Sequence, residues 1–378
     1  MHNRHQERNL LKRKLAAGLS IHMPAPRRIG KTWTIGRLAA DLRDDGWLVI
    51  EIDVEGMRTP KEFARDLCAR IEAQISIRAR FTTQVNQRFK NLLGGNWGDK
   101  PLDALGKVDP VEFAETLIAS LEESGDKTAI VIDEISYFFL ALAEDNVKEA
   151  HAFAYKLRAL QQRYKKVRWL ITGSIGLDTI ARRYGLEGAF VDFETFVLEP
   201  FTIAEALSYV RDPAMQQMFN HRFDASDADF EAIFSQLGWL APYYLNLVAN
   251  EVRPSIAGAA GEPATATRAD LDAAFDKLLQ PNRKSAFAIW REHIDKNLPK
   301  PDRAIAKNVL DFLSKRGSEG ENENTLRAQV SSIGSVKIPQ LREILAMLGN
   351  DGLIVKVDRR YTFRSGLVRR YWAEYEAE

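Results

Sequence analysis

The stretch Pro24-Ala25-Pro26-Arg27-Arg28-Ile29-Gly30-Lys31-Thr32 decides the fold. It follows a short apolar run, Ile21-His22-Met23, and precedes a helix that the pattern predicts over residues 33–43. A Gly-Lys-Thr sequence between a strand and a helix is typical of a phosphate-binding loop, because the N–H groups at the helix N-terminus bind phosphate oxygens. Lys31 would add a positive charge for the β- and γ-phosphates, and the Thr32 hydroxyl would ligate Mg²⁺. The sequence therefore predicts a nucleotide site around these residues.

One position departs from the general pattern of such loops. The pattern has glycine five residues before its second glycine, and this chain has Ala25 there. Glycine at that position allows a positive φ and a close approach of the backbone to the ligand. Alanine narrows the conformations of the loop but removes no donor and no ligand, so the prediction of a nucleotide site stands.

A second buried strand ends in two carboxylates. The run Ile130-Val131-Ile132 is followed directly by Asp133 and Glu134. In a parallel sheet this strand and the loop before Lys31 would both end at the carboxyl edge, where ligands bind. Asp133 would then hold Mg²⁺, and Glu134 would polarise the attacking water as a general base. The alternative is that both carboxylates only cap the next helix, where acidic side chains are favoured.

A third strand ends in hydroxyl-bearing residues. Arg168-Trp169-Leu170-Ile171 leads into Thr172-Gly173-Ser174. A hydroxyl of Thr172 or Ser174 could hydrogen-bond the γ-phosphate or the attacking water, and so report hydrolysis. The alternative is an ordinary polar turn. The position one strand beyond the acidic pair favours a role in the site.

The order of the predicted elements indicates an α/β fold. Strands alternate with helices up to residue 200, which is typical of a parallel sheet covered on both faces. The expected strands are 47–53, 129–132, 168–171 and 196–198, and the expected helices are 59–76, 110–123 and 147–164. Residues 78–109 are predicted to be an irregular insertion or loop. From Thr202 to about Lys296 the pattern predicts helices only.

The C-terminal part has the pattern of a winged helix. Helices are expected over 302–315, 325–332 and 338–349, followed by strands 353–357 and 360–363 that turn at Asp358-Arg359. The predicted domains are an N-terminal basic helix (1–20), a nucleotide-binding domain (21–200), a helical lid (201–298) and a winged helix (302–378).

Composition excludes several classes of protein. The chain has 378 residues, of which 45% are apolar and 28% charged, so it can build a large core. Its net charge is +1, so no global field draws it to nucleic acid or anionic lipid. A single cysteine, Cys68, rules out an intramolecular disulfide and a thiolate zinc cluster. The sequence has no long apolar run for a membrane span and no signal-peptide pattern at its N-terminus, so we expect a soluble cytoplasmic protein.

The three motifs together with the lid sequence resemble AAA+/STAND-type P-loop ATPases, in particular the archaeal-ATPase branch. Leu237-Gly238-Trp239-Leu240-Ala241-Pro242 is similar to that group's lid motif, and Tyr361-Thr362-Phe363 with Tyr371-Trp372 is similar to its winged helix. The resemblance implies ATP and Mg²⁺ as ligands. It also implies that residues Pro26 to Trp33 surround the nucleotide and that Pro242 packs near adenine.

The resemblance also implies an oligomer on ATP binding. In such families an arginine often completes the site of a neighbouring subunit. Arg182 and Arg183 lie at the expected place after the third motif, but they are equally compatible with solvated helix charges. Arg27 and Arg28 match the family's own loop, and one of them would brace the loop against the winged helix instead.

Two functions remain open at this level. The first is an ATP-hydrolysing conformational switch, slow without a partner or oligomer, that passes its nucleotide state to a partner protein in defence, signalling or mobile-element function. The second is a nucleotide-gated ATPase that binds DNA through its winged helix. Residues 302–378 carry 13 basic and 11 acidic side chains, a weak charge signature for DNA binding. The basic helix at the N-terminus either packs on its domain or touches phosphate or an acidic partner; charge runs of this kind more often face water.

Overall fold

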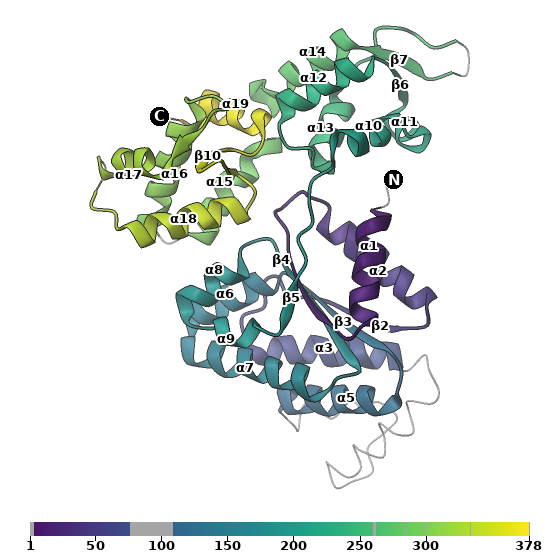
Figure 1. Ribbon diagram of the computed structural model, residues 1–378. Helices are drawn as coiled ribbons and strands as arrows, with labels where there is room; N and C mark the ends of the chain where they lie inside the picture. The colour runs from purple at the N-terminus through teal and green to yellow at the C-terminus, as the bar shows by residue number, and fades with distance from the viewer. Residues whose placement is uncertain are drawn as a thin grey trace. The chain divides into compact units, whose positions relative to one another are not determined.

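A computed structural model describes residues 4–75, 109–259, 262–283, 285–298, 300–332 and 334–377. The chain forms two compact units (Figure 1). One comprises residues 4–25 and 32–198, and the other comprises residues 1–3, 26–31 and 199–378. We call them the sheet unit and the C-terminal unit. The predicted insertion at 78–109 lies almost entirely outside the described residues.

The sheet unit contains a five-stranded parallel sheet in the order β2-β3-β4-β1-β5. Its strands are β1 (Ser20–Pro24), β2 (Leu48–Asp53), β3 (Thr128–Asp133), β4 (Val167–Gly173) and β5 (Phe193–Thr195). The central strands are buried along most of their length, as expected for a sheet with both faces covered. The α/β fold class predicted from the sequence is confirmed.

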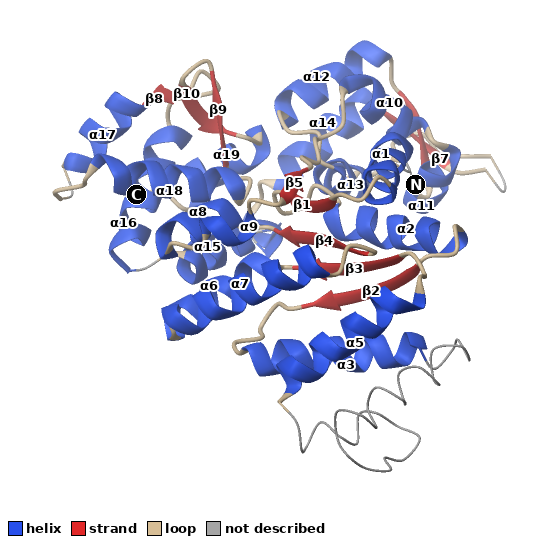
Figure 2. Ribbon diagram, turned by 60° about the horizontal axis from the view of Figure 1, so that its bottom comes forward, coloured by secondary structure: helices blue, strands red, loops and turns tan. Residues whose placement is uncertain are grey.

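Helices cover both faces of this sheet (Figures 1 and 2). Figure 1 shows α1 and α2 on one side of the sheet and α6 to α9 on the other. The helices are α1 (His5–Ala16), α2 (Lys31–Asp44), α3 (Pro60–Ile75), α5 (Pro110–Ser124), α6 (Ile135–Asp145), α7 (Val147–Arg163), α8 (Leu177–Tyr184) and α9 (Glu187–Phe190). A hydrophobic core packs Ile130, Trp169 and Ile171 of the sheet against α3 and α5 to α8, and it includes a cluster of phenylalanine rings around Phe138.

Helix α1 packs on its own unit. Leu11 and Leu15 are fully buried, and the guanidinium of Arg8 donates to both carboxylate oxygens of Asp41 on α2 at 2.7 and 3.0 Å. Lys12 pairs with Asp45, the residue just after α2, at 2.6 Å. Two of the basic side chains of this helix are thus neutralised within the unit, which favours the packing interpretation over a phosphate-binding arm.

Two helices of the sheet unit begin directly after their capping residues. Asp109 accepts a hydrogen bond from Val111 N–H at 2.9 Å and precedes Pro110, the first residue of α5. Thr59 and Glu62 exchange side-chain to backbone hydrogen bonds at the start of α3. These polar residues identify the boundaries of α3 and α5 in the sequence.

The first half of the C-terminal unit is mostly helical. It contains α10 (Ile203–Arg211), α11 (Pro213–Phe219), α12 (Asp227–Leu237), α13 (Pro242–Glu251), α14 (Arg268–Leu278), the 3-10 turn η2 (Pro281–Arg283) and α15 (Ser285–Asn297). Two short parallel strands, β6 (His221–Asp224) and β7 (Ala264–Thr267), also pair here. The prediction of helices only between Thr202 and Lys296 was therefore wrong, because four-residue strands with few apolar residues give no periodic signal.

The second half has the element order of a winged helix. The helices are α16 (Lys300–Ser314), α17 (Glu323–Ser331) and α18 (Ile338–Asn350). A small antiparallel sheet in the order β8-β10-β9 accompanies them. Its strands are β8 (Glu321–Asn322), β9 (Ile354–Val357) and β10 (Arg360–Phe363), and α19 (Gly366–Tyr375) follows. The predicted turn is correct, since Asp358 and Arg359 adopt positive φ values of 46° and 66°.

Two details of the sheet unit differ from the sequence prediction. The fifth strand is residues 193–195 and not 196–198, because Ser20 to His22 of β1 pair with Phe193 to Thr195. Helix α6, directly after Glu134, was not predicted at all. Among the described residues no helix has the length and apolar character needed to cross a membrane.

Candidate nucleotide and metal site

Strand β1 leads into the predicted phosphate-binding loop. Ala25 follows the strand, is 3% exposed, and donates its N–H to Gly173 O at 3.3 Å. The loop turns at Arg28 and Gly30, with φ of 73° and 92°, and α2 begins at Lys31. Ala25 is not among the residues with positive φ. The glycine of the general pattern is therefore not required here, since alanine adopts this backbone without strain.

The loop residues 26–31 pack within the C-terminal unit. The guanidinium carbon of Arg28 lies 3.6 Å from the ring centre of Tyr243, which directly follows Pro242 at the start of α13. A Cβ on Gly30 would lie 3.7 Å from Cγ of Pro242. Arg27 Nε is 4.0 Å from Asp351 Oδ1, just after α18. Pro242 thus lies beside the loop, and Tyr243 is a neighbour that sequence reasoning missed.

Thr32 and Asp133 are the residues whose oxygens would hold a metal ion. Thr32 is exposed in the first turn of α2, and its Oγ1 lies 3.4 Å from Asp133 Oδ2 at the end of β3. Hydroxyl and carboxylate oxygens are ligands that suit Mg²⁺, which keeps several waters and also takes oxygens from substrate phosphates. No group of three or more His, Cys, Asp or Glu gathers as a metal site in the described parts of the chain. The donor set fits an ion that arrives with a nucleotide, rather than an all-protein metal cage.

Glu134 occupies an unusual backbone conformation directly after β3. Its φ is 57°, and α6 begins at the next residue. The left-handed conformation costs a residue with a side chain roughly 1–2 kcal/mol, and such costs are concentrated at functional sites. The side chain is 8% exposed, and its Oε2 accepts hydrogen bonds from Ser174 N–H at 3.0 Å and from the Ser174 hydroxyl at 2.8 Å. It does not cap α6 with its side chain, so the simple capping alternative is not what the structure contains.

Thr172 completes a small network of oxygens. Its hydroxyl donates to Asp133 Oδ1, which also accepts from Glu134 N–H at 2.9 Å. Thr172 and Ser174 are 0% and 2% exposed. The structure thus gathers five predicted residues at one edge of the sheet: Thr32, Asp133, Glu134, Thr172 and Ser174.

The other predicted site residues lie in the loop, on α2 and on α8. Lys31 is buried at the start of α2, Ile29 is fully buried, and Trp33 is half-buried with Arg37 5.7 Å from its ring. Arg182 and Arg183 lie in the last turn of α8. The Arg182 side chain is 79% exposed, and its Nε is 3.5 Å from Glu187.

Two further residues shape the site without being predicted. A Cβ on Gly173 would lie 2.1 Å from Ser136 Oγ and 2.8 Å from Ser136 Cβ, closer than atoms can approach. Ser136 is fully buried in the first turn of α6. Glycine at 173 therefore lets the turn after β4 approach the segment after β3. The Thr-Gly-Ser sequence pointed to Gly173. Its contact with Ser136 could not be predicted, because α6 itself was not predicted.

Comparisons with known proteins establish the fold. No protein-family model matches the chain, and no curated protein matches it. Among solved structures, the chain is similar to the Walker-type ATPase of Pyrococcus abyssi, with 16% identity, a TM-score of 0.64, and coverage of 98% of this chain and 95% of that chain. The ORC2 protein of Aeropyrum pernix in its ADP form matches with 14% identity and a TM-score of 0.45, over 98% of this chain and 91% of that chain. The chain therefore has the fold of a Walker-type P-loop ATPase, as the resemblance in its motifs implied.

Proposed function

We propose that this protein binds ATP with Mg²⁺ and hydrolyses it at the network formed by Thr32, Asp133 and Glu134. The observation that carries the proposal is that a Thr–Asp oxygen pair 3.4 Å apart and the buried carboxylate of Glu134 lie together at one sheet edge, with Thr32 ending the Gly-Lys-Thr sequence. When bound, Mg²⁺ would neutralise phosphate charge. Lys31 and the N–H groups of the loop would bind the β- and γ-phosphates, and Glu134 would orient and deprotonate the attacking water.

We propose further that hydrolysis drives a conformational switch. Arg28 lies against Tyr243, and Arg27 lies near Asp351, so the loop that would hold phosphate also packs on residues of the predicted lid and of the predicted winged helix. A change in the loop between nucleotide states would alter these contacts, and the output would pass to a partner protein. Defence, signalling and mobile-element functions are settings for such a switch. The proposed domains, 1–20, 21–200, 201–298 and 302–378, are the parts that would move.

The distribution of charge favours this switch over the DNA-binding alternative. Lys356, Arg359 and Arg360 are exposed on the hairpin, and Arg360 also donates to Gly320 O at 3.2 Å. Three other basic residues of the predicted winged helix make contacts within the C-terminal unit. Arg364 donates to Gly349 O at 3.2 Å, and its guanidinium carbon is 5.2 Å from the ring centre of Trp239. Arg369 donates to Ser314 O, and Arg370 pairs with Asp276.

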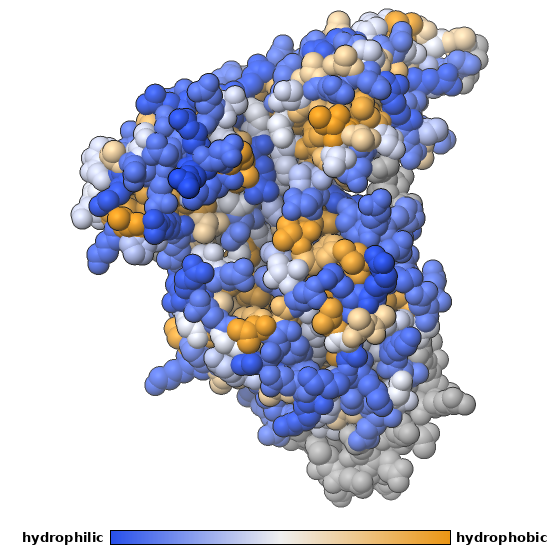
Figure 3. All heavy atoms as spheres, viewed as in Figure 1, coloured by the Kyte–Doolittle hydropathy of each residue, from blue (hydrophilic) through white to orange (hydrophobic). Residues whose placement is uncertain are grey.

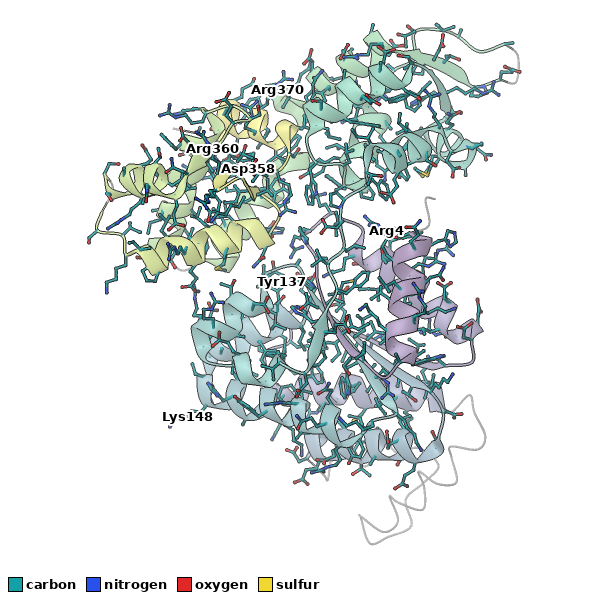
Figure 4. The ribbon with its side chains drawn as sticks, viewed as in Figure 1. Arg4, Tyr137, Lys148, Asp358, Arg360 and Arg370 are labelled. Carbon is teal, nitrogen blue, oxygen red and sulfur yellow. The ribbon has the colours of Figure 1, made fainter. Side chains whose placement is uncertain are left out.

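Figures 3 and 4 show how the basic residues of this domain are distributed. Figure 4 labels Asp358 and Arg360 on the hairpin and Arg370 on α19, so the basic residues come from separate elements. The surface of this domain in Figure 3 is mainly hydrophilic. On α18, which would enter a DNA groove, Arg342 is paired with Glu323 at 2.7 Å. Among the described residues of this domain, the exposed basic side chains outside these contacts lie on several elements, including Arg327 on α17 and Arg359 on the hairpin.

A substitution of the loop lysine tests the proposal. Lys31→Ala removes the charge that would bind the β- and γ-phosphates, so ATP·Mg affinity should fall by at least about tenfold. Isothermal titration calorimetry of both proteins with the same ATP·Mg solution measures this change. Lys148→Ala is the control, because Lys148 is an exposed residue on α7. Equal ATP affinity in wild type and Lys31→Ala would overturn the proposed site.

A further inference from the structure

The hydroxyls after β4 are bound to carboxylates. The Thr172 hydroxyl donates to Asp133 and the Ser174 hydroxyl donates to Glu134, and both residues are at least 98% buried. A residue that hydrogen-bonded the γ-phosphate directly would point its hydroxyl toward the ligand. These two side chains instead each contact one of the two acidic residues that the proposed reaction uses.

The contact between Ser174 and Glu134 fixes the orientation of the Glu134 carboxylate. The N–H and the hydroxyl of Ser174 reach the same oxygen, Oε2, at 3.0 and 2.8 Å. Two donors from one residue leave the carboxylate little freedom to rotate, and hydrogen bonds to charged groups are stronger than neutral ones. The side chain of Glu134 is thereby held in one orientation at the end of β3.

The contact between Thr172 and Asp133 fixes the other carboxylate. Asp133 Oδ1 accepts from Thr172 and from Glu134 N–H, and this leaves Oδ2 facing Thr32 at 3.4 Å. Such contacts to a metal-binding carboxylate raise its affinity by fixing its direction, as outer-shell partners of metal ligands do. Gly173 makes both contacts compatible, because a Cβ there would overlap Ser136.

We propose that Thr172 and Ser174 are positioning residues with separate tasks: Thr172 orients the metal-binding carboxylate of Asp133, and Ser174 orients the base, Glu134. This rests on the proposed ATP hydrolysis at the same site. It replaces the sequence-based hypothesis that either hydroxyl contacts the γ-phosphate or the attacking water. The turn then acts on the reaction through the two carboxylates.

The base-orienting task predicts a change in turnover without a change in affinity. Ser174→Ala keeps the N–H bond and loses the hydroxyl bond, so kcat should fall roughly 10- to 100-fold while calorimetric ATP affinity stays the same. Ser174→Cys keeps a weaker donor of similar size, so its kcat should lie between those of wild type and Ser174→Ala.

A double variant separates this action from direct phosphate contact. If Ser174 acts through Glu134, then adding Ser174→Ala to Glu134→Gln should cost less than about threefold in single-turnover hydrolysis. A direct contact with phosphate or water would cost the same factor in both backgrounds. The same loss in both backgrounds, or a tenfold loss of ATP affinity in Ser174→Ala, would overturn the proposal.

The metal-orienting task has a readout that does not depend on hydrolysis. For Thr172→Val, the Mg²⁺ concentration that gives half-maximal binding of a fluorescent ATP analogue should rise about 10-fold or more. At saturating Mg²⁺ its kcat should return to within about threefold of wild type. Identical behaviour of Thr172→Val and Ser174→Ala in both assays would contradict the separation of tasks.

Matched controls exclude general loss of structure. Ser120→Ala and Thr128→Val remove buried hydroxyls of the same unit that donate to backbone carbonyls of Thr116 and Asp126, and both should behave as wild type. Thermal unfolding identifies any variant that does not fold, and for position 174 the cysteine variant then carries the test. If wild type itself neither binds nor hydrolyses ATP, the proposed function fails. If wild type is active and the variants do not separate, only this inference fails.

Discussion

At the scale of single residues, the geometry of the site depends on positions that carry no reactive group. A Cβ would not fit at Gly173. Glu134 adopts a left-handed backbone conformation, and its carboxylate accepts a hydrogen bond from Ser174. Both features concern the close approach of two strand ends. The hydroxyls and carboxylates could be predicted from the sequence, because their residue types and spacing indicate the chemistry. Which hydroxyl binds which carboxylate could not, because the contacts join residues about forty positions apart through the fold.

Substitution of Gly173 tests the close approach. In Gly173→Ala the new Cβ would overlap Ser136, so we expect a loss of about 1–3 kcal/mol in the free energy of unfolding together with lower ATP turnover. Adding Ser136→Ala removes the nearest atom and should restore part of both. Gly36→Ala is the control: nothing lies within 4 Å of a Cβ at that position on α2, so stability should stay the same or rise. A Gly173→Ala protein with wild-type stability and turnover would show that the approach is not needed.

At the scale of elements, hydrophobic runs predicted the strands that carry the motifs. Strands β3 and β4 have the apolar stretches 129–132 and 169–171 and lead into the predicted polar residues, and β1 leads into the predicted loop. Strand β5 does not: Phe193–Thr195 is defined by its pairing with β1, and the more apolar segment that follows it contains Val197, which is 53% exposed. Helix α6 was missed because it follows directly after a residue with positive φ, which the sequence does not reveal. The local sequence pattern therefore did not predict β5, which is defined by pairing with β1, or α6, which follows a strained backbone position.

Strand β1 also carries a buried histidine, which predicts a pH effect on stability. Burial lowers the pKa of His22 below its ordinary value, and the charge of Asp178 opposes this effect. Unfolded, His22 takes up a proton near its ordinary pKa of about 6.5, whereas the folded protein takes it up at lower pH. The contribution of neutral His22 to the free energy of unfolding is therefore fully present above about pH 6.5. It is lost as the pH falls toward the pKa of His22 in the folded protein, with a slope of at most about 1.4 kcal/mol per pH unit.

Urea unfolding at pH 7.5 and pH 5.5 measures this effect. The wild type should be less stable at pH 5.5, and His22→Leu should lose less stability between the two values. Burial also lowers the pKa of His221, so part of the dependence should remain in the variant. An equal loss in wild type and His22→Leu would assign the effect to other groups.

At the scale of the whole molecule, the exposed Arg182 side chain bears on whether copies of this chain associate. Its side chain is 79% exposed near the end of α8 and pairs with Glu187 at 3.5 Å. Exposed ion pairs of this kind contribute little to stability, so the arginine is free to serve another contact at low cost. We propose that ATP binding brings copies of this chain together and that Arg182 or Arg183 then contacts the γ-phosphate of the neighbour.

A mixing experiment tests this completion in trans. Arg182→Ala/Arg183→Ala should bind ATP normally and lose about 10³-fold or more in hydrolysis, because a guanidinium at the γ-phosphate stabilises charge as the bond breaks. Mixing it with Lys31→Ala should restore some activity, since each protein supplies what the other lacks. Specific activity of the wild type should rise with protein concentration. Full activity of the double variant at every concentration would assign both arginines to solvated helix charge.

The central claim, that Glu134 is the base of an ATP-hydrolysing site, is tested most directly by Glu134→Gln. The amide keeps the size of the side chain and leaves Asp133 and the loop intact, so ATP·Mg affinity by calorimetry should match the wild type. Single-turnover hydrolysis should fall about 10²–10⁴-fold, because the water loses its proton acceptor. Turnover within about threefold of the wild type, at equal ATP occupancy, would contradict the account.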